Sequence, residues 1–219
     1  RNFKNRAIRE QHRMEMTNAV AHNLKTPLCI INGFSENLRE ESGYLTKQHY
    51  INVIQEQANE MDILVHKMLD FSKLETDSAK LNIKSFNIKT ELENIAKKYN
   101  DISSKNIIVT ADDKEIFADK EIMELVFENL IENAVKYSKD NSDIEISFVN
   151  NNFNISNECD EISKKDLKKI WKPYNRLEKD EEVRGTGIGL SIVKHILKLH
   201  RIKPYTEYSG GRLIIGFYI

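Results

Sequence analysis

The first residues that could do chemistry are a histidine and a threonine on one face of a predicted helix. At about 100° per residue, His22 falls opposite an apolar stripe and Thr26 lies one turn further along the same outer face. The stripe consists of Val20, Leu24, Pro27, Ile31, Phe34 and Leu38. Neutral imidazole is a competent nucleophile near physiological pH, so His22 could accept a transferred group. An ordinary surface histidine is the alternative.

The second group pairs two amides with a lysine and a tyrosine on one helix. In the predicted helix 120–137, Asn129 and Asn133 fall on the apolar side. A buried amide without a partner costs about 1–3 kcal/mol, so the pattern indicates a ligand there. Amide oxygens suit a Mg²⁺ ion that bridges nucleotide phosphates, Lys136 could meet a phosphate, and Tyr137 could lie against a nucleoside. The alternative is that both amides cap neighbouring loops.

The third group is a glycine-rich run followed at once by an amphipathic segment. Gly185, Gly187 and Gly189 alternate with other residues. Glycines in this position allow backbone N–H groups and a helix N-terminus to approach a phosphate. The spacing is not that of a Rossmann motif and no Walker lysine is present, so the two common nucleotide folds are disfavoured.

Two heptad helices precede these nucleotide motifs. Thr46 could cap the second helix, whose apolar residues are Ile51, Ile54, Ala58, Met61, Val65 and Met68. A two-helix hairpin cannot bury both of its apolar stripes alone, so the pattern predicts a dimeric four-helix bundle. A lone antiparallel coiled coil packed on the rest of the chain is the alternative.

Beyond a polar linker, short strands and helices alternate, which predicts an α/β-layer domain and an α+β chain overall. Strands are expected at 107–110, 115–118, 144–149, 153–156 and 212–219, and helices at 90–99, 120–137, 163–170 and 188–199. The expected domains are 1–75 for the hairpin, 76–84 for the linker and 85–219 for the layered domain.

Composition narrows the class of protein. The 219 residues carry 33 basic and 34 acidic side chains, a formal charge of −1 that gives no electrostatic footprint for nucleic acid. The two cysteines lie far apart in sequence, which fits a reducing compartment. The histidines show no metal-ligand spacing, and no apolar run is long enough to span a bilayer. Because the chain begins at Arg1 without a Met, we expect a cytoplasmic fragment of a longer protein.

Four segments, in this order, resemble the boxes of the sensor histidine kinases of bacterial two-component systems. Ala21-His22-Asn23-Leu24-Lys25-Thr26-Pro27-Leu28 resembles the phospho-acceptor box. Residues 129–137 resemble the asparagine box of the Bergerat-type ATP fold. Residues 170–176 resemble its aromatic box, and residues 185–190 its second glycine box. The resemblance implies a homodimer that uses ATP and Mg²⁺ and acts on a cognate response regulator. In this family a membrane-anchored sensor usually precedes these boxes.

The resemblance also assigns roles to the residues around the histidine. His22 would take the γ-phosphoryl group of ATP and pass it to a response-regulator aspartate. The next residue is usually acidic and takes the imidazole proton, but here it is Asn23, so slow autophosphorylation is expected. Thr26 matches the position that orients water for dephosphorylating the regulator.

In the nucleotide site, the resemblance makes Asn133 the metal ligand and Asn129 its support. Residues 177–184 would form the ATP lid, with Arg184 as a contact for the γ-phosphate. The first glycine box usually begins with an aspartate that accepts the adenine amino hydrogen. Asn157 fills that position here, and both glycines of the box are replaced.

Two other functions compete with the kinase. A non-catalytic nucleotide-sensing scaffold that binds a response regulator would explain Asn23 and the altered first glycine box. An ATPase that uses the same fold as a conformational clamp would need a glutamate base at position 129, where the chain has Asn129. Phosphoryl transfer to His22 would separate the kinase from both.

Overall fold

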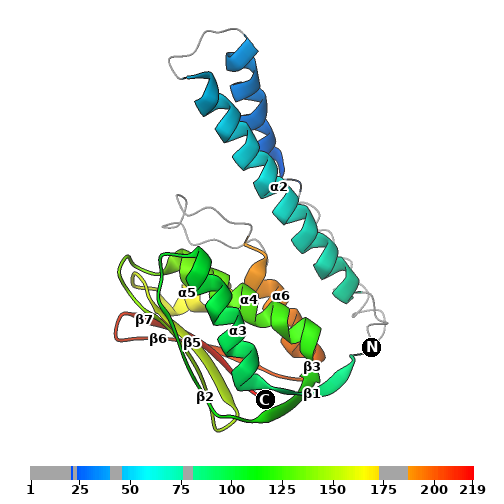
Figure 1. Cartoon of the computed structure of the whole chain (residues 1–219), viewed down its shortest axis with the longest axis vertical. Coiled ribbons are helices and arrows are strands. Elements are labelled where there is room, and N and C mark those ends of the chain that lie inside the picture. The colour runs from blue at the N-terminus through cyan, green and yellow to red at the C-terminus, as the bar shows by residue number, and fades with distance from the viewer. Residues whose placement is uncertain (1–20, 22–23, 40–45, 76–80, 173–186) are drawn as a thin grey trace. The chain divides into compact units, whose positions relative to one another are not determined.

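The computed structural model describes residues 21, 24–39, 46–75, 81–172 and 187–219 (Figure 1). The chain divides into two compact units, Arg1–Lys73 and Leu74–Ile219. The first is helical and the second layers helices on a mixed sheet, so the predicted α+β fold class is confirmed. Within the described ranges, no helix combines the length and the apolar character that a bilayer span requires.

The first unit contains a helix over 24–39 and all but the last two residues of helix α2, Lys47–Glu75. As predicted, Thr46 caps α2: its Oγ1 accepts the His49 N–H at 3.3 Å. The Phe34 ring meets the Tyr50 ring edge-on, with 5.6 Å between centroids, so an aromatic contact joins the two helices.

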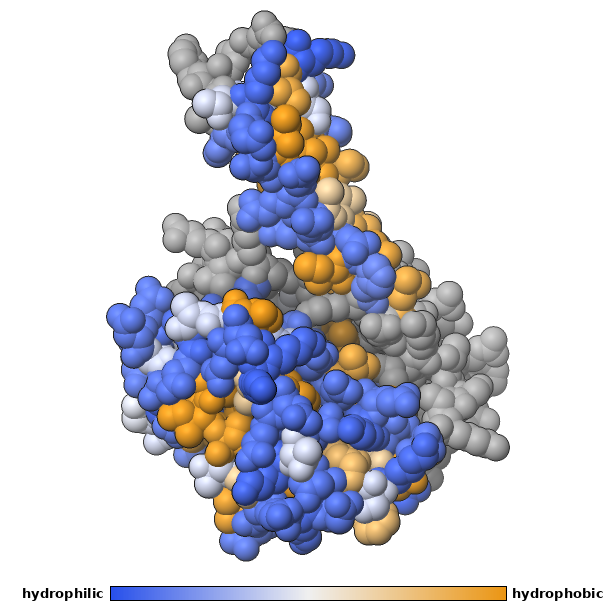
Figure 2. Space-filling view, viewed as in Figure 1, coloured by the Kyte–Doolittle hydropathy of each residue, from blue (hydrophilic) through white to orange (hydrophobic). Residues whose placement is uncertain are grey.

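The hairpin covers only part of the apolar stripe predicted for α2. The side chains that it buries, Tyr50, Gln57 and Leu64, lie to one side of that stripe. Ile51 remains 37% exposed and Val65 40% exposed. Figure 2 shows apolar side chains running along this unit at its surface. A single copy of the hairpin therefore leaves apolar surface in water.

The second unit contains two sheets. Strands β1, Ile83–Asn87, and β3, Glu115–Asp119, form an antiparallel pair. The five-stranded sheet has the order β2-β4-β5-β7-β6. Its strands are β2 Ile107–Ala111, β4 Ile144–Val149, β5 Asn152–Glu158, β6 Pro204–Ser209 and β7 Arg212–Tyr218. Only the β2–β4 pair is parallel among them, since β3 and the next helix lie between these two strands in the chain.

Three helices cover one face of the larger sheet: α3, Ile88–Ile102, α4, Lys120–Tyr137, and α6, Gly189–Leu199 (Figure 1). Between the helices and the sheet, the ring of Phe153 packs on two others. Its centroid lies 5.2 Å from that of Phe127, on α4, and 4.8 Å from that of Phe217, on β7. Along β4 and β5, buried and solvent-facing side chains alternate, as expected for a sheet with one covered face. The short helix α5, Lys164–Lys169, contacts β6.

The sequence predicts most of these elements within a few residues, and the differences have physical reasons. Strands β1 and β6 lie outside the predicted ranges. Most β6 side chains are half-buried, so the strand shows no clear alternation between apolar and polar residues. The spacing of Glu121, Glu124, Glu128 and Glu132 predicts an acidic outer face for α4. Instead Glu128 pairs with Lys98 of α3 at 2.6 Å, and Glu132 accepts a hydrogen bond from the Tyr99 hydroxyl at 3.1 Å.

Candidate nucleotide-binding site

The centre of the site is a buried asparagine on α4 against the first residue of α6. Asn129 is only 8% exposed, and its Nδ2 donates to the Leu125 carbonyl at 2.7 Å. Its Oδ1 is buried and has no hydrogen-bond partner among the described residues. A Cβ added at Gly189 would lie 2.9 Å from that oxygen, so any larger residue at this position would displace the asparagine side chain. An unpaired buried acceptor at a helix N-terminus marks a place for a polar ligand.

The N-terminus of α6 lies in the same place. Ile188 is its N-cap residue, and no side chain of the described residues caps this end of the helix. Gly187, directly before it, has a φ of 66°, a left-handed conformation that favours glycine. The first N–H groups of a helix lack intrahelical partners and carry the positive end of the helix dipole. This end of α6 therefore suits an anion such as a phosphate.

The remaining predicted residues of α4 follow Asn129 towards the C-terminus of the helix. Asn133, Lys136 and Tyr137 are all half-buried. The Lys136 ammonium lies over the Tyr137 ring, 5.5 Å from its centroid. Helix α4 therefore presents, in order, an amide oxygen, a second amide, a cation and an aromatic ring.

The end of strand β5 adjoins the end of α4. The Lys139 N–H, just beyond the helix, donates to the Glu158 carbonyl at 2.9 Å. Asn157, one residue earlier, is 3% exposed and lies on the buried side of β5, with its Nδ2 donating to the Glu158 carbonyl at 3.3 Å. The fold thus brings Asn157 to the same end of the domain as Tyr137, which the sequence alone could not establish.

Electrostatics differ on the two sides of α4. On the side facing α3, burial and the neighbouring carboxylates of Glu91 and Glu128 raise the pKa of Glu124. Burial and the charge of Glu132 raise the pKa of Tyr99 well above its ordinary value. The side that carries Asn129 and Asn133 consists of neutral amides with Lys136 beyond them. Acceptance of an anionic ligand is therefore favoured on the amide side.

Several predicted residues lie outside the described part of the chain: His22, Asn23, Arg184, Gly185 and the segment 177–184. Thr26 is described, and it is exposed on the helix over 24–39. From the aromatic box, Trp171 is 9% exposed, and its Nε1 donates to Thr206 Oγ1 at 2.7 Å, which anchors the chain to β6.

The side of α4 that carries Asn129 and Asn133 offers amide oxygens to a metal. Within the described ranges, no group of three or more His, Cys, Asp or Glu side chains could hold a metal ion. Mg²⁺ takes hard oxygen ligands and usually retains several waters while it binds nucleotide phosphates. The unpaired Oδ1 of Asn129 and the nearby amide of Asn133 are oxygen donors of the type such an ion requires.

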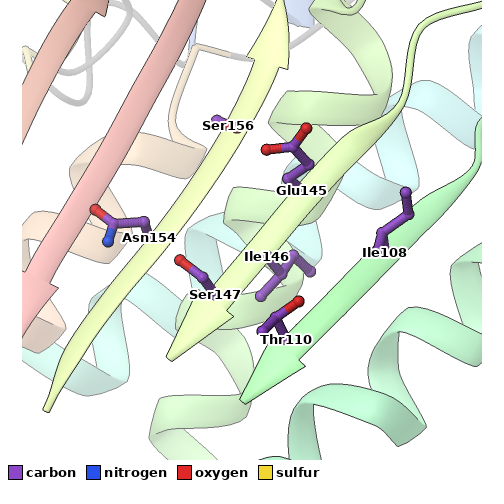
Figure 3. Close-up of a pocket in the computed structure, with 7 residues that line it drawn as sticks. All are labelled: Ile108, Thr110, Glu145, Ile146, Ser147, Asn154 and Ser156. Carbon is purple, nitrogen blue, oxygen red and sulfur yellow. The ribbon is translucent and has the colours of Figure 1, made fainter. Parts of the chain in front are cut away.

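A hollow lies on the face of the larger sheet that α3, α4 and α6 do not cover (Figure 3). Its volume is about 230 Å³, and it is lined by Ile108, Thr110, Glu145, Ile146, Ser147, Asn154 and Ser156. Its single charged lining residue is the Glu145 carboxylate, which pairs with Arg212 at 3.5 Å, whereas α4 and α6 bring a buried amide oxygen to a helix N-terminus. The amide side of α4 remains the better place for a nucleotide.

The fold and the site together define a helical hairpin followed by a Bergerat-type ATP-binding domain. Residues 12–77 match the His Kinase A (phospho-acceptor) domain. Residues 118–215 match the family described as histidine kinase-, DNA gyrase B-, and HSP90-like ATPase. The chain belongs to the sensor histidine kinases of bacterial two-component systems.

Individual relatives agree with this assignment. The chain is 29% identical over 218 residues to the sensor protein kinase WalK of Staphylococcus aureus, covering 93% of this chain and 52% of that protein. The structure of histidine kinase ThkA in complex with response regulator protein TrrA has a TM-score of 0.77 at 22% identity, covering 99% of this chain and 64% of that chain. Full-length ShkA in complex with AMPPNP gives 0.64 at 14% identity, covering 92% and 45%. The chain thus spans about half the length of this WalK sequence.

Proposed function

We propose that the chain is the kinase core of a sensor protein, which binds ATP between α4 and α6 and transfers its γ-phosphoryl group to His22. The observation that carries the proposal is the Oδ1 of Asn129, which has no hydrogen-bond partner among the described residues and lies beside Gly189 at the N-terminus of α6. The AMPPNP bound in the ShkA structure, a protein of similar fold, supports a nucleotide as the ligand.

Each residue of the site has a separate task in this proposal. Asn133, supported by Asn129, would hold Mg²⁺, which when bound offsets negative charge on the phosphates. The N–H groups of Gly187 and Gly189 donate to phosphate oxygens at the start of α6. Lys136 adds a positive charge on the same side.

The other end of the site would hold the nucleoside. Tyr137 offers a ring face to it, while Asn157 accepts the adenine amino hydrogen. Arg184 and Gly185 would contact the phosphates from the segment before α6.

In the transfer step, an imidazole nitrogen of His22 attacks the γ-phosphorus. A phosphorus–nitrogen bond forms, the bond to the oxygen that bridges the β- and γ-phosphates breaks, and ADP leaves. The attacking nitrogen is neutral and carries no hydrogen, so the proton on the other ring nitrogen must leave for the ring to become neutral again. Asn23 can orient the ring through a hydrogen bond, but an amide cannot take that proton, so water must.

We therefore expect slow autophosphorylation that an acidic residue at position 23 would accelerate. General-base assistance is typically worth about 10²- to 10⁴-fold, so Asn23→Asp should raise the single-turnover rate by at least about 100-fold. Rapid quenching of the reaction between the chain and labelled ATP measures that rate. An unchanged rate would show that Asn23 does not limit the transfer.

A response regulator is the proposed partner, since ThkA, a protein of similar fold, was solved in complex with one. Its aspartate would take the phosphoryl group from His22. Thr26 is exposed one turn beyond His22, where its hydroxyl could orient water for the reverse, phosphatase reaction. We expect Thr26→Ala to abolish hydrolysis of the phosphorylated regulator and to leave His22 labelling intact. Unchanged hydrolysis would remove Thr26 from the mechanism.

The chain would act as a homodimer in the cytoplasm, where ATP and regulator are both available. A second hairpin would cover the part of the α2 stripe that one copy leaves exposed.

The test is phosphorylation of the full chain by γ-labelled ATP with Mg²⁺, compared with His22→Gln. The kinase predicts label that is stable in alkali, labile in acid and absent from the variant. ATP binding without label or hydrolysis would instead favour the regulator-binding scaffold. ATP hydrolysis without label on the protein would favour a conformational ATPase.

A further inference from the structure

Helices α4 and α6 pack against each other along their length, and polar contacts lie at both ends of the pair; the nucleotide site occupies only one end. At one end, Gly189 meets the Oδ1 of Asn129. At the other, His200, the C-cap residue of α6, meets Asp119, the N-cap residue of α4. The helices therefore run antiparallel. At 1.5 Å per residue, the two contacts are about 15 Å apart along α4 and about 16 Å apart along α6.

The contact between His200 and Asp119 depends on the His200 imidazole, which accepts a hydrogen bond at one ring nitrogen and donates one from the other. The Asp119 N–H donates to His200 Nε2 at 3.2 Å. Since Nε2 accepts, Nδ1 carries the ring hydrogen and donates to the Ile196 carbonyl at 3.0 Å. One imidazole thus links the last turn of α6 to a backbone N–H at the start of α4.

Both residues are held by further bonds, so the link has little freedom. The two carboxylate oxygens of Asp119 accept the N–H groups of Asn82 and Ile122 at 2.8 and 3.4 Å. Beyond His200 the chain turns sharply at Arg201, whose φ is 60°, and the Ile202 N–H returns to the Leu197 carbonyl at 2.8 Å. The end of α6 and the start of α4 are therefore fixed points.

We propose that His200 is a positioning residue: by accepting the Asp119 N–H, it fixes the axial register of α6 on α4 and so the place of Gly189 against Asn129. A slip of one residue would move Gly189 by about 1.5 Å. That is enough to separate the helix N-terminus from the amide oxygen. The role in ATP binding rests on the proposed function, whereas the register is a property of the protein without nucleotide.

Two substitutions separate the two hydrogen bonds of the ring. In His200→Gln, the amide oxygen can reach the position of Nε2 and accept the Asp119 N–H. In His200→Asn, the shorter amide can replace only Nδ1 and donate to the Ile196 carbonyl. Ile107→Val, a core change on β2 beneath α3, serves as a control for general loss of stability.

The full chain and each variant are compared by titration with Mg²⁺-ATP and by NMR of the nucleotide-free protein. We expect His200→Asn to weaken Mg²⁺-ATP binding by about tenfold and to shift the Gly189 amide and Asn129 side-chain resonances. His200→Gln and Ile107→Val should stay within about twofold of the parent chain. The proposal is wrong if His200→Asn binds Mg²⁺-ATP as tightly as the parent chain. It is also wrong if His200→Gln loses as much Mg²⁺-ATP affinity as His200→Asn.

A second readout needs no substitution. The Asp119 amide in the parent chain should exchange its hydrogen slowly with solvent, because His200 accepts it, and fast exchange would overturn the register role. Should the parent chain fail to bind Mg²⁺-ATP, the proposed function would fall. The nucleotide-free NMR comparison would still decide whether His200 sets the register.

Discussion

The two units of the chain leave different kinds of group unsatisfied. In the helical unit, apolar side chains of α2 remain in water, Val65 and Leu69 among them. The second unit also exposes single apolar side chains, Phe117 and Ile102 among them, but it encloses a large apolar core, and the described groups inside it that lack a partner are polar. The buried side-chain atoms without a hydrogen bond in the described part of the chain are Asn129 Oδ1 and Ser138 Oγ, on α4 and at its C-cap.

This contrast teaches what each unit requires. Exposed apolar surface is best removed from water by another apolar surface, whereas a buried acceptor needs a donor or a cation. A second copy of the hairpin meets the first requirement, and a metal–nucleotide complex meets the second. Variants of the apolar stripe should weaken the dimer and leave nucleotide binding unchanged, and variants of the amide site should do the reverse.

The largest effect is expected from a charge on the apolar stripe of the hairpin. Val65→Glu would place a carboxylate in each half of the proposed dimer core, where an unpaired charge is costly. We expect the dimer dissociation constant to rise by about 100-fold or more, measured by sedimentation equilibrium.

Ile63→Glu is the matched control, because Ile63 is also exposed but lies about 160° from Val65 around the helix. It should leave the dimer intact. Equal dissociation by both variants, or by neither, would contradict a dimer interface built on this stripe.

A smaller effect is expected from a methyl group in the nucleotide site. In Gly189→Ala the new Cβ would lie 2.9 Å from Asn129 Oδ1, so the asparagine must move. We expect Mg²⁺-ATP affinity to fall by about tenfold, measured by isothermal titration calorimetry.

Gly33→Ala provides the same chemical change in the other unit. A Cβ at Gly33 would have nothing within 4 Å, and the residue is helical, so this variant should gain about 0.5–1 kcal/mol of stability. Its ATP affinity should not change. A normal affinity in Gly189→Ala would show that the Gly189–Asn129 contact is not part of the site.

The smallest effect concerns the acidic side of α4. Because the folded-state pKa of Glu124 is raised, its ionised form destabilises the fold, and this penalty is largest above that pKa and fades as the pH falls below it. Glu124→Gln should therefore add a few tenths of a kcal/mol at neutral pH and nothing in acid, in urea unfolding at both pH values.

Glu121→Gln should have the opposite sign, because Glu121 lies in the first turn of α4, where a negative charge is favourable. A gain in both variants would mean that net charge, rather than burial against α3, sets the effect.

The periodicity of the sequence was sufficient for the helices and for the paired amides of α4. The close approach of Gly189 to Asn129 was not predictable, since it depends on the packing of two helices about sixty residues apart in the chain. The link between Asp119 and His200 was missed for the same reason. Glycine in the expected phosphate loop was the signal that a close contact existed, although it did not identify the partner.

The central claim is that a metal–nucleotide complex binds at the buried Oδ1 of Asn129, and it can be tested on two buried amides. Asn129 and Gln57 are 8% and 4% exposed, one in each unit, and both side chains carry NH₂ groups visible by NMR. During titration with ATP, the account predicts a saturable, Mg²⁺-dependent shift of the Asn129 side-chain resonances and no shift for Gln57. ATP binding that leaves Asn129 unchanged would contradict it.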